Sequence, residues 1–547
     1  MIATIEPRKA KDRLHGSGEI AFLDVREAGQ FGEGHPLFAV PCPYSRLELI
    51  VPGLVPNPKV PVILIDAGDG MAGRAARRLE GLGYLNVSMV AGGAPGWEAA
   101  GLTLFKGVNV PSKTLGELAE AAWHPPTIDA ETLRGWQAGG TKFGLFDARP
   151  PAEFAKMRVP GAVCLPNGEL AHRLAAAVAD DDRPIVITCA GRTRGLVGAI
   201  GLKLAGVGNP VFALENGTQG WALAGGELER GAEAKPFPRL DEAALEASRA
   251  RARAILARFG IPCIDTAALE AMQADRSRTT YLLDVRSAEE FSAGHLPGAV
   301  HAPGGQLVQA TDQWIGVQRA RVLLLDDTGL RAALAAFWLR QMGCECHVLA
   351  GSAQSPPPLR GRARKGGRTL PLPLVDMNHL TPISPEKAAA GLANGTHHLL
   401  DLRSSQAFRV GRPAGAHWSI RPRLALPPSQ PSPARGEGSR ALAAILFADD
   451  RAMAEIVSID LRELGCRDIF LLDGGMDAWC AAGLPVEVSP DRPSPEEAID
   501  YLRFVHDRHD GNLESSRRYL AWEQGLVAQL DAAERAEFRL ERPASFG

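Results

Sequence analysis

One cysteine in this chain stands where a thiol could do chemistry. Cys189 follows a short apolar run, 185–188, whose β-branched residues predict a buried strand. A loop that contains glycine and two arginines comes next, and residues 196–205 predict a helix. Backbone N–H groups and the positive end of the helix dipole converge at such a junction. We therefore expect a reactive thiol with a lowered pKa beside a site for an anion.

The loop residues themselves suit an anion. The predicted substrate-binding residues are Ala190, Gly191, Arg192, Thr193, Arg194 and Gly195, together with Arg158 from an earlier turn. Ala190 and Gly191 are small, so the loop can fold tightly around a bound sulfur atom. A buried structural cysteine is the alternative interpretation, and the polar, cationic loop argues against it. Two interpretations of Arg158 are left open: it adds positive charge to the pocket, or its side chain is solvated.

The composition is that of an ordinary protein with several domains. A chain of 547 residues is too long for one core, and 45% apolar with 22% charged residues is typical of globular chains. A net charge of −3 gives no reason to expect nucleic acid as a partner. Neither a membrane span nor a signal peptide is predicted, and the eight cysteines show no disulfide-framework spacing, so the cytoplasm is the expected compartment. Cys344 and Cys346 are interpreted as packing residues, and no metal is predicted.

A four-residue motif occurs four times along the chain. Its form is Leu or Phe, then Asp, any residue and Arg, and the copies begin at Leu23, Phe146, Leu283 and Leu400. An aromatic residue follows each copy, and then comes a turn that is most complete in residues 294–299. Repetition of this kind indicates a tandem array of one structural unit.

Two fixed spacings locate the position equivalent to Cys189, one from the repeated aspartate and one to the turn after the following helix. The two agree in units one to three, and unit four, which carries five extra residues, is placed by the second spacing alone. These positions hold Asp66, Cys189, Asp326 and Ala448 in chain order. Each follows a short apolar run that predicts a strand. A carboxylate would repel an anion and is no sulfur nucleophile, and alanine offers no reactive group. The sequence therefore predicts one working site among four.

The order strand, helix, strand, helix predicts the α/β class, with a mostly parallel sheet flanked by helices in each unit. We expect units one to four at 8–105, 126–232, 262–353 and 381–488, and a helical tail at 494–547. Ligands of such sheets bind at the carboxyl ends of the strands, which is where Cys189 falls. Asp147 and Arg149 predict a structural ion pair, because the same pair recurs in units without the cysteine.

These motifs together resemble the rhodanese domain, the sulfurtransferase fold, in four tandem copies. The resemblance rests on Asp284-Val285-Arg286 with the turn at 294–299, on the Cys189 loop, and on glycine-to-tryptophan closures at 93–97, 217–221 and 475–479. Only Cys189 matches the family's cysteine. Units one, three and four therefore resemble the inactive rhodanese modules that accompany active ones.

The resemblance implies a sulfurtransferase without a cofactor, in which Cys189 carries a persulfide and the loop backbone cradles it. The implied reaction moves sulfane sulfur from a small anion, thiosulfate or a persulfide, to cyanide or a thiol. The alternative is a scaffold or sulfur-relay protein that takes a persulfide from a partner protein. Related phosphatases place an arginine six positions after the cysteine, where this chain has Gly195, so phosphate chemistry fits less well.

The connecting segments and the tail give weaker expectations. Helices are predicted over 115–123 and 241–259, and the Pro/Gly/Arg-rich segments 355–368 and 426–440 are predicted to be disordered. In the tail a first helix is predicted to begin at Ser494, and a second to carry Tyr519, Trp522 and Leu530. This helical hairpin would pack on the repeats or on a second subunit, so a homodimer is an open expectation.

Overall fold

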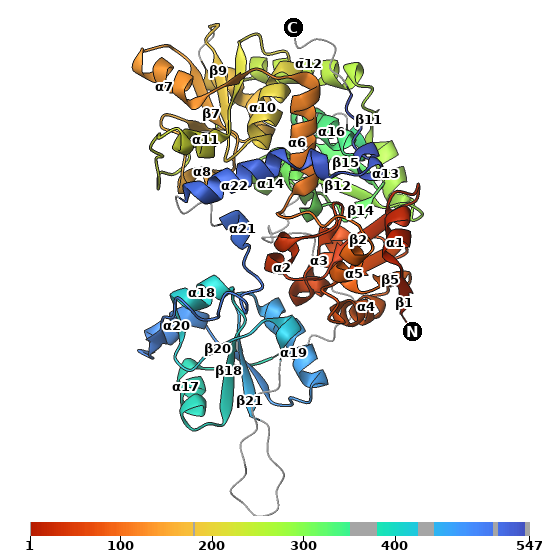
Figure 1. The fold of residues 1–547 in the computed structure, drawn as a ribbon, viewed down its shortest axis with the longest axis vertical. Helices are drawn as coiled ribbons and strands as arrows, with labels where there is room; N and C mark the ends of the chain where they lie inside the picture. The colour runs from red at the N-terminus through yellow and green to blue at the C-terminus, as the bar shows by residue number, and fades with distance from the viewer. Residues whose placement is uncertain (1, 179–180, 350–379, 425–441, 507–511, 542–547) are drawn as a thin grey trace, which may run out of the picture.

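A computed structural model of the chain describes residues 2–178, 181–349, 380–424, 442–506 and 512–541 (Figure 1). Each repeated unit forms a small body built on one mostly parallel sheet with helices on its faces. The predicted α/β class with tandem units is therefore confirmed. The two segments predicted to be disordered, 355–368 and 426–440, lie outside the described residues.

Unit two shows the plan that the other units share. Its strand order is β6-β10-β9-β7-β8, and all neighbouring strands are parallel. The strands are β6 (Thr127–Ile128), β7 (Gly144–Asp147), β8 (Val163–Cys164), β9 (Ile185–Thr188) and β10 (Val211–Leu214). The helices are α7 (Ala130–Ala138), α8 (Pro151–Lys156), α9 (Asn167–Ala177), α10 (Thr193–Leu204) and α11 (Gly217–Leu223). Since β9 is the central strand and is wholly buried, its carboxyl end is fixed from both sides.

The other sheets repeat this order. Unit one contains β1 (Ala3–Ile5), β2 (Ile20–Asp24), β3 (Val40–Pro41), β4 (Val62–Ile65) and β5 (Val87–Val90), with α1 (Pro7–Leu14), α2 (Ala28–Glu33), η1 (Tyr44–Arg46), α3 (Leu47–Leu54), α4 (Met71–Gly81) and α5 (Gly93–Ala99). Unit three contains β11 (Cys263–Ile264), β12 (Thr280–Asp284), β13 (Val300–His301), β15 (Arg321–Leu325) and β16 (Glu345–Leu349), with α13 (Thr266–Ala274), α14 (Ala288–Ala293), α15 (Gly304–Gln309), η2 (Thr311–Gln313) and α16 (Leu330–Gln341). Unit four contains β17 (Thr381–Ile383), β18 (His397–Asp401), β20 (His417–Trp418), β21 (Ala443–Phe447) and β22 (Ile469–Leu472), with α17 (Pro385–Ala393), α18 (Ser405–Val410), η3 (Arg421–Arg423), α19 (Arg451–Glu463) and α20 (Gly475–Ala481). A separate two-stranded sheet there pairs β19 (Arg412–Pro413) with β23 (Val486–Glu487).

The repeated Asp-x-Arg motif forms the same ion pair in every unit. The Nη2–Oδ2 distances are 2.5, 2.6, 2.6 and 2.7 Å for Arg26–Asp24, Arg149–Asp147, Arg286–Asp284 and Arg403–Asp401. Each arginine also donates a hydrogen bond to the backbone carbonyl of the residue eight positions further along the chain. These residues are Gly34, Met157, Gly294 and Gly411. The pair thus ties the end of the strand beside the central one to the turn after the following short helix.

The units are joined by direct contacts. The short strand β14 (Val317–Gln318) of unit three pairs antiparallel with β2 of unit one, so one sheet spans two units. Unit four meets unit one through Arg421, whose side chain is 0% exposed and pairs with Glu48 and Asp460 at 2.5 and 3.0 Å. Figure 1 shows unit four below unit one, while units two and three lie side by side at the top.

The predicted connecting helices exist with shifted ends. The first is α6 (Val110–Trp123), which begins five residues before the predicted start, and the second is α12 (Glu242–Arg258). A proline in the first turn suits the start of α6, because that position needs no N–H donor.

The prediction of a helix starting at Ser494 is wrong. Ser494 and Glu497 do form the expected capping contacts, but turns follow instead of a helix. The Arg423 guanidinium donates hydrogen bonds to the backbone carbonyls of Glu496 and Glu497, and the Gly29 N–H donates one to the carbonyl of Ile499. Tertiary partners therefore use the acceptors that a helix would need.

The described tail instead contains α21 (Arg503–His506), α22 (Leu513–Gln524), η5 (Val527–Gln529) and α23 (Ala532–Ala536). Helix α22, in blue, crosses unit two, where it contacts α6 and α11 (Figure 1). The tail thus packs on the repeats of its own chain.

Candidate active site

Cys189 directly follows β9, and residues 190–192 separate it from the start of α10. That helix begins at Thr193, so Thr193, Arg194 and Gly195 belong to its first turn rather than to the predicted loop. The loop is held by the start of α11, where the Thr218 N–H donates to the Cys189 carbonyl at 2.8 Å. Gly217 has φ of +53°, and a Cβ there would lie 2.3 Å from that carbonyl oxygen, so only glycine permits this approach.

The expectation of a lowered thiol pKa is wrong in direction. Cys189 is only 2% exposed, and burial raises the pKa of its thiol. The Arg194 charge and the Gly195 N–H act in the opposite direction and lower this pKa, while the carboxylate of Glu523 raises it. The junction does supply the predicted cation and N–H donor, but desolvation of the thiolate outweighs them.

The two loop arginines are already paired with carboxylates. Arg192 donates to Glu117 at 2.7 Å and also binds Glu120, both on α6. Arg194 forms a two-point ion pair with Glu153 of α8, with distances of 2.8 and 2.7 Å. Their charges therefore reach an anion in the pocket only in part, because a neutralising carboxylate stands behind each guanidinium.

Arg158 is not brought to Cys189. Its guanidinium pairs with Glu229 at 2.9 Å and lies 4.8 Å from the centre of the Phe154 ring. Its backbone also pairs with that of Glu229. Arg158 is not among the residues that line the cavity over Cys189, and its side chain instead closes the unit-two turn, so substrate binding by Arg158 gains no support from the structure.

A cavity of about 300 Å³ lies over Cys189. Unit two lines it with Arg149, Glu153, Lys156, Met157 and residues 189–194. The other walls come from the 108–113 linker, from unit three and from the tail, through Val108, Asn109, Lys113, Gln306, Gln309, Ala310, Gln313, Tyr519 and Glu523. No local pattern in the sequence around Cys189 indicates these walls. Tyr519 alone carried a signal, as part of the apolar stripe expected to pack on the repeats.

The equivalent site of unit one is filled by its own carboxylate. Asp66 accepts hydrogen bonds from the Gly68 and Ala72 N–H groups, each at 2.9 Å. Ala72 stands six residues after Asp66, as Gly195 stands six after Cys189. The carboxylate therefore occupies the N–H donors that face the thiol in unit two.

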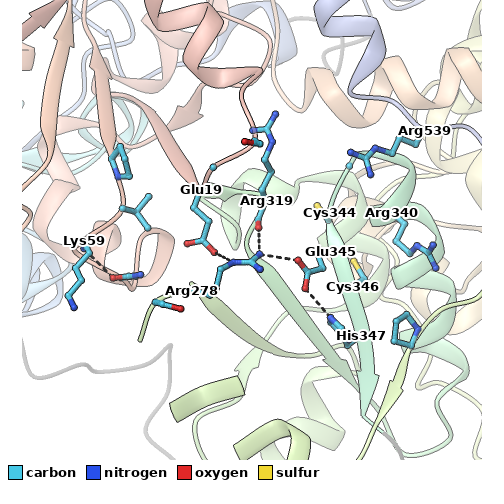
Figure 2. Close-up of a pocket in the computed structure, with 18 of the residues that line it drawn as sticks. Glu19, Lys59, Arg278, Arg319, Arg340, Cys344, Glu345, Cys346, His347 and Arg539 are labelled. Atoms are coloured by element: carbon cyan, nitrogen blue, oxygen red, sulfur yellow. Dashed lines mark hydrogen bonds and ion pairs between the residues drawn. The ribbon is translucent and has the colours of Figure 1, made fainter. Parts of the chain in front are cut away.

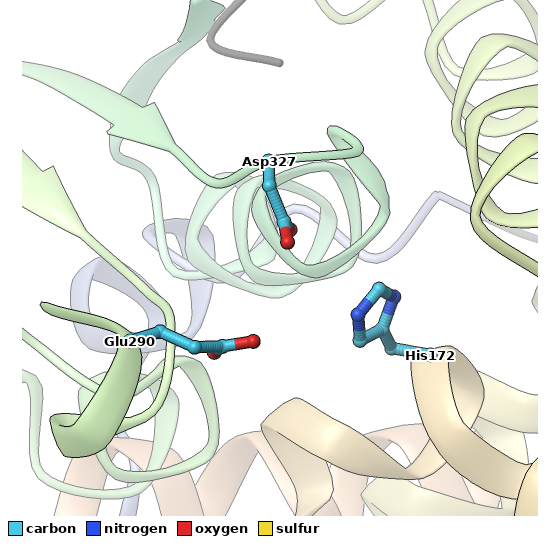
Figure 3. Close-up of side chains that lie close together, drawn as sticks. All are labelled: His172, Glu290 and Asp327. Atoms are coloured by element: carbon cyan, nitrogen blue, oxygen red, sulfur yellow. The ribbon is translucent and has the colours of Figure 1, made fainter. Parts of the chain in front are cut away.

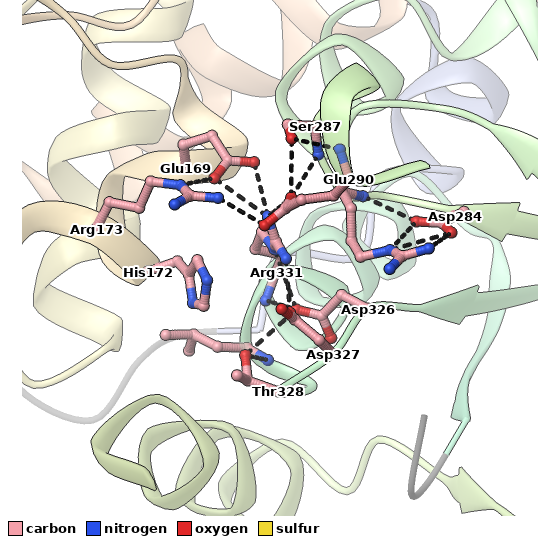
Figure 4. Close-up of polar contacts among 12 residues, drawn as sticks. Glu169, His172, Arg173, Asp284, Ser287, Glu290, Asp326, Asp327, Thr328 and Arg331 are labelled. Atoms are coloured by element: carbon pink, nitrogen blue, oxygen red, sulfur yellow. Dashed lines mark hydrogen bonds and ion pairs between the residues drawn. The ribbon is translucent and has the colours of Figure 1, made fainter. Parts of the chain in front are cut away.

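In unit three, Asp326 accepts from the backbone N–H groups of Gly329 and Arg331. The Arg331 side chain, 0% exposed, pairs with Asp326 at 3.4 Å, and with Asp327 and Glu290 at 2.6 and 2.7 Å. Glu169 of unit two completes the set at 3.0 Å (Figure 4). Arg331 and Glu290 match Arg194 and Glu153 in position, so in unit three the equivalent position forms an ion-pair interface with unit two.

A group of possible metal ligands borders this interface. Atoms of His172, Glu290 and Asp327 lie within 4.8 Å of one another (Figure 3). Both carboxylates already bind the Arg331 guanidinium, at 2.7 Å for Glu290 and 2.6 Å for Asp327. A guanidinium thus provides the positive charge that a metal ion would bring, and the donor set does not fit a metal.

A groove of about 790 Å³ runs between units one and three (Figure 2). Arg278 crosses it and donates to Glu19 at 2.8 Å and to Glu345 at 3.0 Å. Cys344 and Cys346 lie along one wall, and Cys346 is 2% exposed in the core, as expected of a packing residue. The charges at the centre of the groove, those of Arg278, Glu19 and Glu345, are therefore paired with one another.

None of the helices within the described ranges is long and apolar enough to cross a membrane.

Comparison with known proteins gives a consistent result. The family model described as "Rhodanese-like domain" matches residues 6–100, 129–224, 265–355 and 384–482. The crystal structure of a thiosulfate sulfurtransferase from Pseudomonas aeruginosa is similar with a TM-score of 0.87 and 38% identity, covering 98% of this chain and 99% of that chain.

Two curated relatives match shorter stretches. A thiosulfate sulfurtransferase from Pseudomonas aeruginosa is 28% identical over 176 residues, which are 29% of this chain and 64% of the relative. An HTH-type transcriptional regulator from Mycobacterium tuberculosis is 36% identical over 104 residues, or 19% of this chain and 44% of the relative. The chain therefore spans less than two thirds of the length of these curated relatives.

Proposed function

The chain belongs to the rhodanese-like domain family, and from this premise we propose that it is a sulfurtransferase whose carrier of sulfane sulfur is Cys189. The observation that carries the proposal is that Cys189 is the one thiol among the four equivalent positions, while the others hold Asp66, Asp326 and Ala448. The cavity of about 300 Å³ over this thiol has the size of a small-ligand site.

The proposed reaction has two steps. The Cys189 thiolate attacks the sulfane sulfur of thiosulfate or of a persulfide, the donor's S–S bond breaks, and sulfite or a thiolate leaves with the bonding pair. An acceptor thiolate or cyanide then attacks the outer sulfur of the Cys189 persulfide and regenerates the Cys189 thiolate. No electrons are gained or lost overall, since one S–S bond is exchanged for another bond to the transferred sulfur.

The residues around Cys189 support these steps. The Gly195 N–H and the Arg194 guanidinium stabilise negative charge on Cys189, and both lower the pKa of its thiol against the effect of burial. Arg149 and Arg194 line the cavity and would offset the charge of an anionic donor. Ala190, Gly191, Arg192 and Thr193 complete the loop around the outer sulfur.

A sulfur-relay role, with a protein as the persulfide donor, is the second candidate. Its support is the enclosure of the cavity by other parts of the chain, as expected if the units also organise a partner. However, the 2% exposure of Cys189 favours a small donor, because a protein-borne persulfide would have to enter the cavity. A cytoplasmic location and a homodimer remain predictions.

Mass spectrometry of the full chain tests the proposal. Treatment with thiosulfate or with a low-molecular-weight persulfide is expected to add one sulfur atom to the Cys189 peptide, and an acceptor thiol or cyanide should remove it. Cys189→Ser should show neither adduct nor turnover, while the control Cys480→Ser, at an exposed cysteine, should behave as wild type. Turnover that persists in Cys189→Ser would refute the assignment. Loading by a protein persulfide alone would favour the relay.

A further inference from the structure

A carboxylate from the tail forms part of the wall over Cys189. Glu523, in the last turn of α22, is 2% exposed and lines the cavity. Its Oε1 accepts a hydrogen bond from the Thr193 hydroxyl at 2.7 Å. Its Oε2 has no hydrogen-bond partner among the described residues. A buried carboxylate oxygen without a donor is costly, so its presence in a ligand cavity points to a donor supplied by the ligand.

The free oxygen faces the catalytic loop. A Cβ added to Gly191 would lie 3.1 Å from Glu523 Oε2, 3.6 Å from Gln219 Nε2 and 3.7 Å from the Tyr519 ring, so the carboxylate lies against the second residue after Cys189. The Gln219 amide makes no hydrogen bond to this oxygen and is itself without a partner among the described residues, so two polar groups here are open to a ligand. The hydrogen bond to Thr193, four residues after Cys189, fixes it from the other side. A group bound beside the Cys189 sulfur would therefore lie close to this oxygen.

Three of the cations that line the cavity with Glu523 are engaged with other groups, and a fourth is exposed. Arg192 and Arg194 pair with carboxylates of α6 and α8, as described above. The Lys113 ammonium binds the Val108 carbonyl and lies 5.4 and 4.9 Å from the ring centres of Tyr519 and Trp522. Lys156 is exposed. The side of the cavity formed by the tail thus presents negative charge to whatever occupies it.

We propose that Glu523 is a specificity-determining residue that selects acceptor thiols bearing an ammonium group close to the thiol. The inference rests on the proposed function and narrows its acceptor. In the transfer, the acceptor thiolate attacks the outer sulfur of the Cys189 persulfide, the Cys189–sulfur bond breaks, and the new R–S–S⁻ product keeps its ammonium on Glu523. An anionic acceptor such as cyanide gains nothing from this contact.

The test compares two acceptors of the same shape, 2-aminoethanethiol and 1-propanethiol, which differ in an ammonium against a methyl group. Cys189 persulfide is formed first, and its decay is followed in single turnover. The ratio of the two rate constants in wild type is divided by that in Glu523→Gln, so that the intrinsic reactivity of each thiol cancels. Loss of a close, desolvated charge pair is expected to lower the preference for the aminothiol about tenfold or more.

Controls separate selectivity from other roles. Glutamine retains an acceptor for the Thr193 hydroxyl, and Glu514→Gln, on the exposed side of α22, should leave the ratio unchanged. If Glu523 acted only as a base or a structural residue, both acceptors would slow equally, and an unchanged ratio would overturn the inference. Wild-type enzyme that shows no preference for the aminothiol at low salt would overturn it as well, even if the variant failed to fold. If no donor formed a persulfide on Cys189, that result would instead refute the proposed function.

Discussion

Replacing Arg331 with methionine removes the guanidinium that the structure places among four carboxylates at the junction of units two and three. The distances are 3.0 Å to Glu169, 2.7 Å to Glu290, 3.4 Å to Asp326 and 2.6 Å to Asp327. Removing one member of a buried ion-pair set costs about 3–5 kcal/mol, because the remaining charges lose compensation. Methionine keeps similar volume, so the loss is of charge rather than packing.

Hydrogen exchange followed by mass spectrometry is the appropriate measurement, since a chain with several units need not unfold in one step. Peptides from α16 and α9 report opening of this junction. A loss of 3–5 kcal/mol should speed their exchange by roughly a hundredfold to a few thousandfold. Arg340→Met, on the same helix with a side chain 27% exposed, should change exchange by less than tenfold.

The stability lost in Arg331→Met should depend on pH in a definite direction. Burial raises the pKa of Asp326 to about 6 against the lowering effect of Arg331, so the variant should raise this pKa further. A carboxyl group with a raised pKa in the folded state binds its proton more tightly than in the unfolded state, so stability falls as pH rises through that pKa. Arg331 also helps to lower the pKa of Glu290 to about 2, a stabilising effect that is present above the group's usual pKa near 4.5.

The Asp326 effect makes the loss of stability in Arg331→Met larger at pH 8 than at pH 5, whereas the Glu290 effect is already nearly complete at pH 5 and adds a similar loss at both pH values. Asp326→Asn in the same chain should therefore restore part of the stability lost at pH 8. A deficit below 1 kcal/mol, or one that grows as the pH falls, would refute the assignment of Arg331 as the charge that holds this junction.

Three further predictions concern the site and the other interface. Alkylation of Cys189 by iodoacetamide should accelerate through the alkaline range, because burial raises the thiol pKa; a rate already constant at pH 7 would contradict this. Arg194→Met should raise that pKa further and slow persulfide loading at pH 7 about tenfold, measured by mass spectrometry of the Cys189 peptide; unchanged loading would show that Arg194 does not act on the thiol. Arg421→Met should weaken the contact of unit four with unit one by about 3–5 kcal/mol, seen as earlier unfolding of unit four in calorimetry, while loading of Cys189 stays normal; impaired loading would mean that the units are coupled.

The fold could be predicted because its signals are local and repeated four times. The Asp-x-Arg motif, the apolar runs before each loop and the fixed spacings all lie within single units, and the structure places Cys189 at the end of a central strand as expected. The tail shows the limit of such reasoning. Ser494 and Glu497 make good capping contacts, but carbonyls committed to Arg423 and Gly29 prevent a helix, and no local pattern contains those partners.

The site was predicted less completely than the fold, for a related reason. The sequence identified Cys189 and its loop but not what surrounds them. Burial, which reverses the expected shift of the thiol pKa, depends on α6, unit three and the tail together. Arg192 and Arg194 looked like free cations because their partners Glu117 and Glu153 are distant along the chain.

The position of α22 has a consequence for how the protein is made. The loop of Cys189 is complete at residue 194, but the chain must extend another 330 residues before Glu523 and the end of α22 exist. At typical rates of 5–20 residues per second this takes roughly 15 to 65 s. During that interval on the ribosome unit two can fold while one wall of its cavity has not yet been synthesised. Cys189 is then less enclosed than in the finished protein, where its side chain is 2% exposed, so synthesis of α22 also sets when this thiol can become buried.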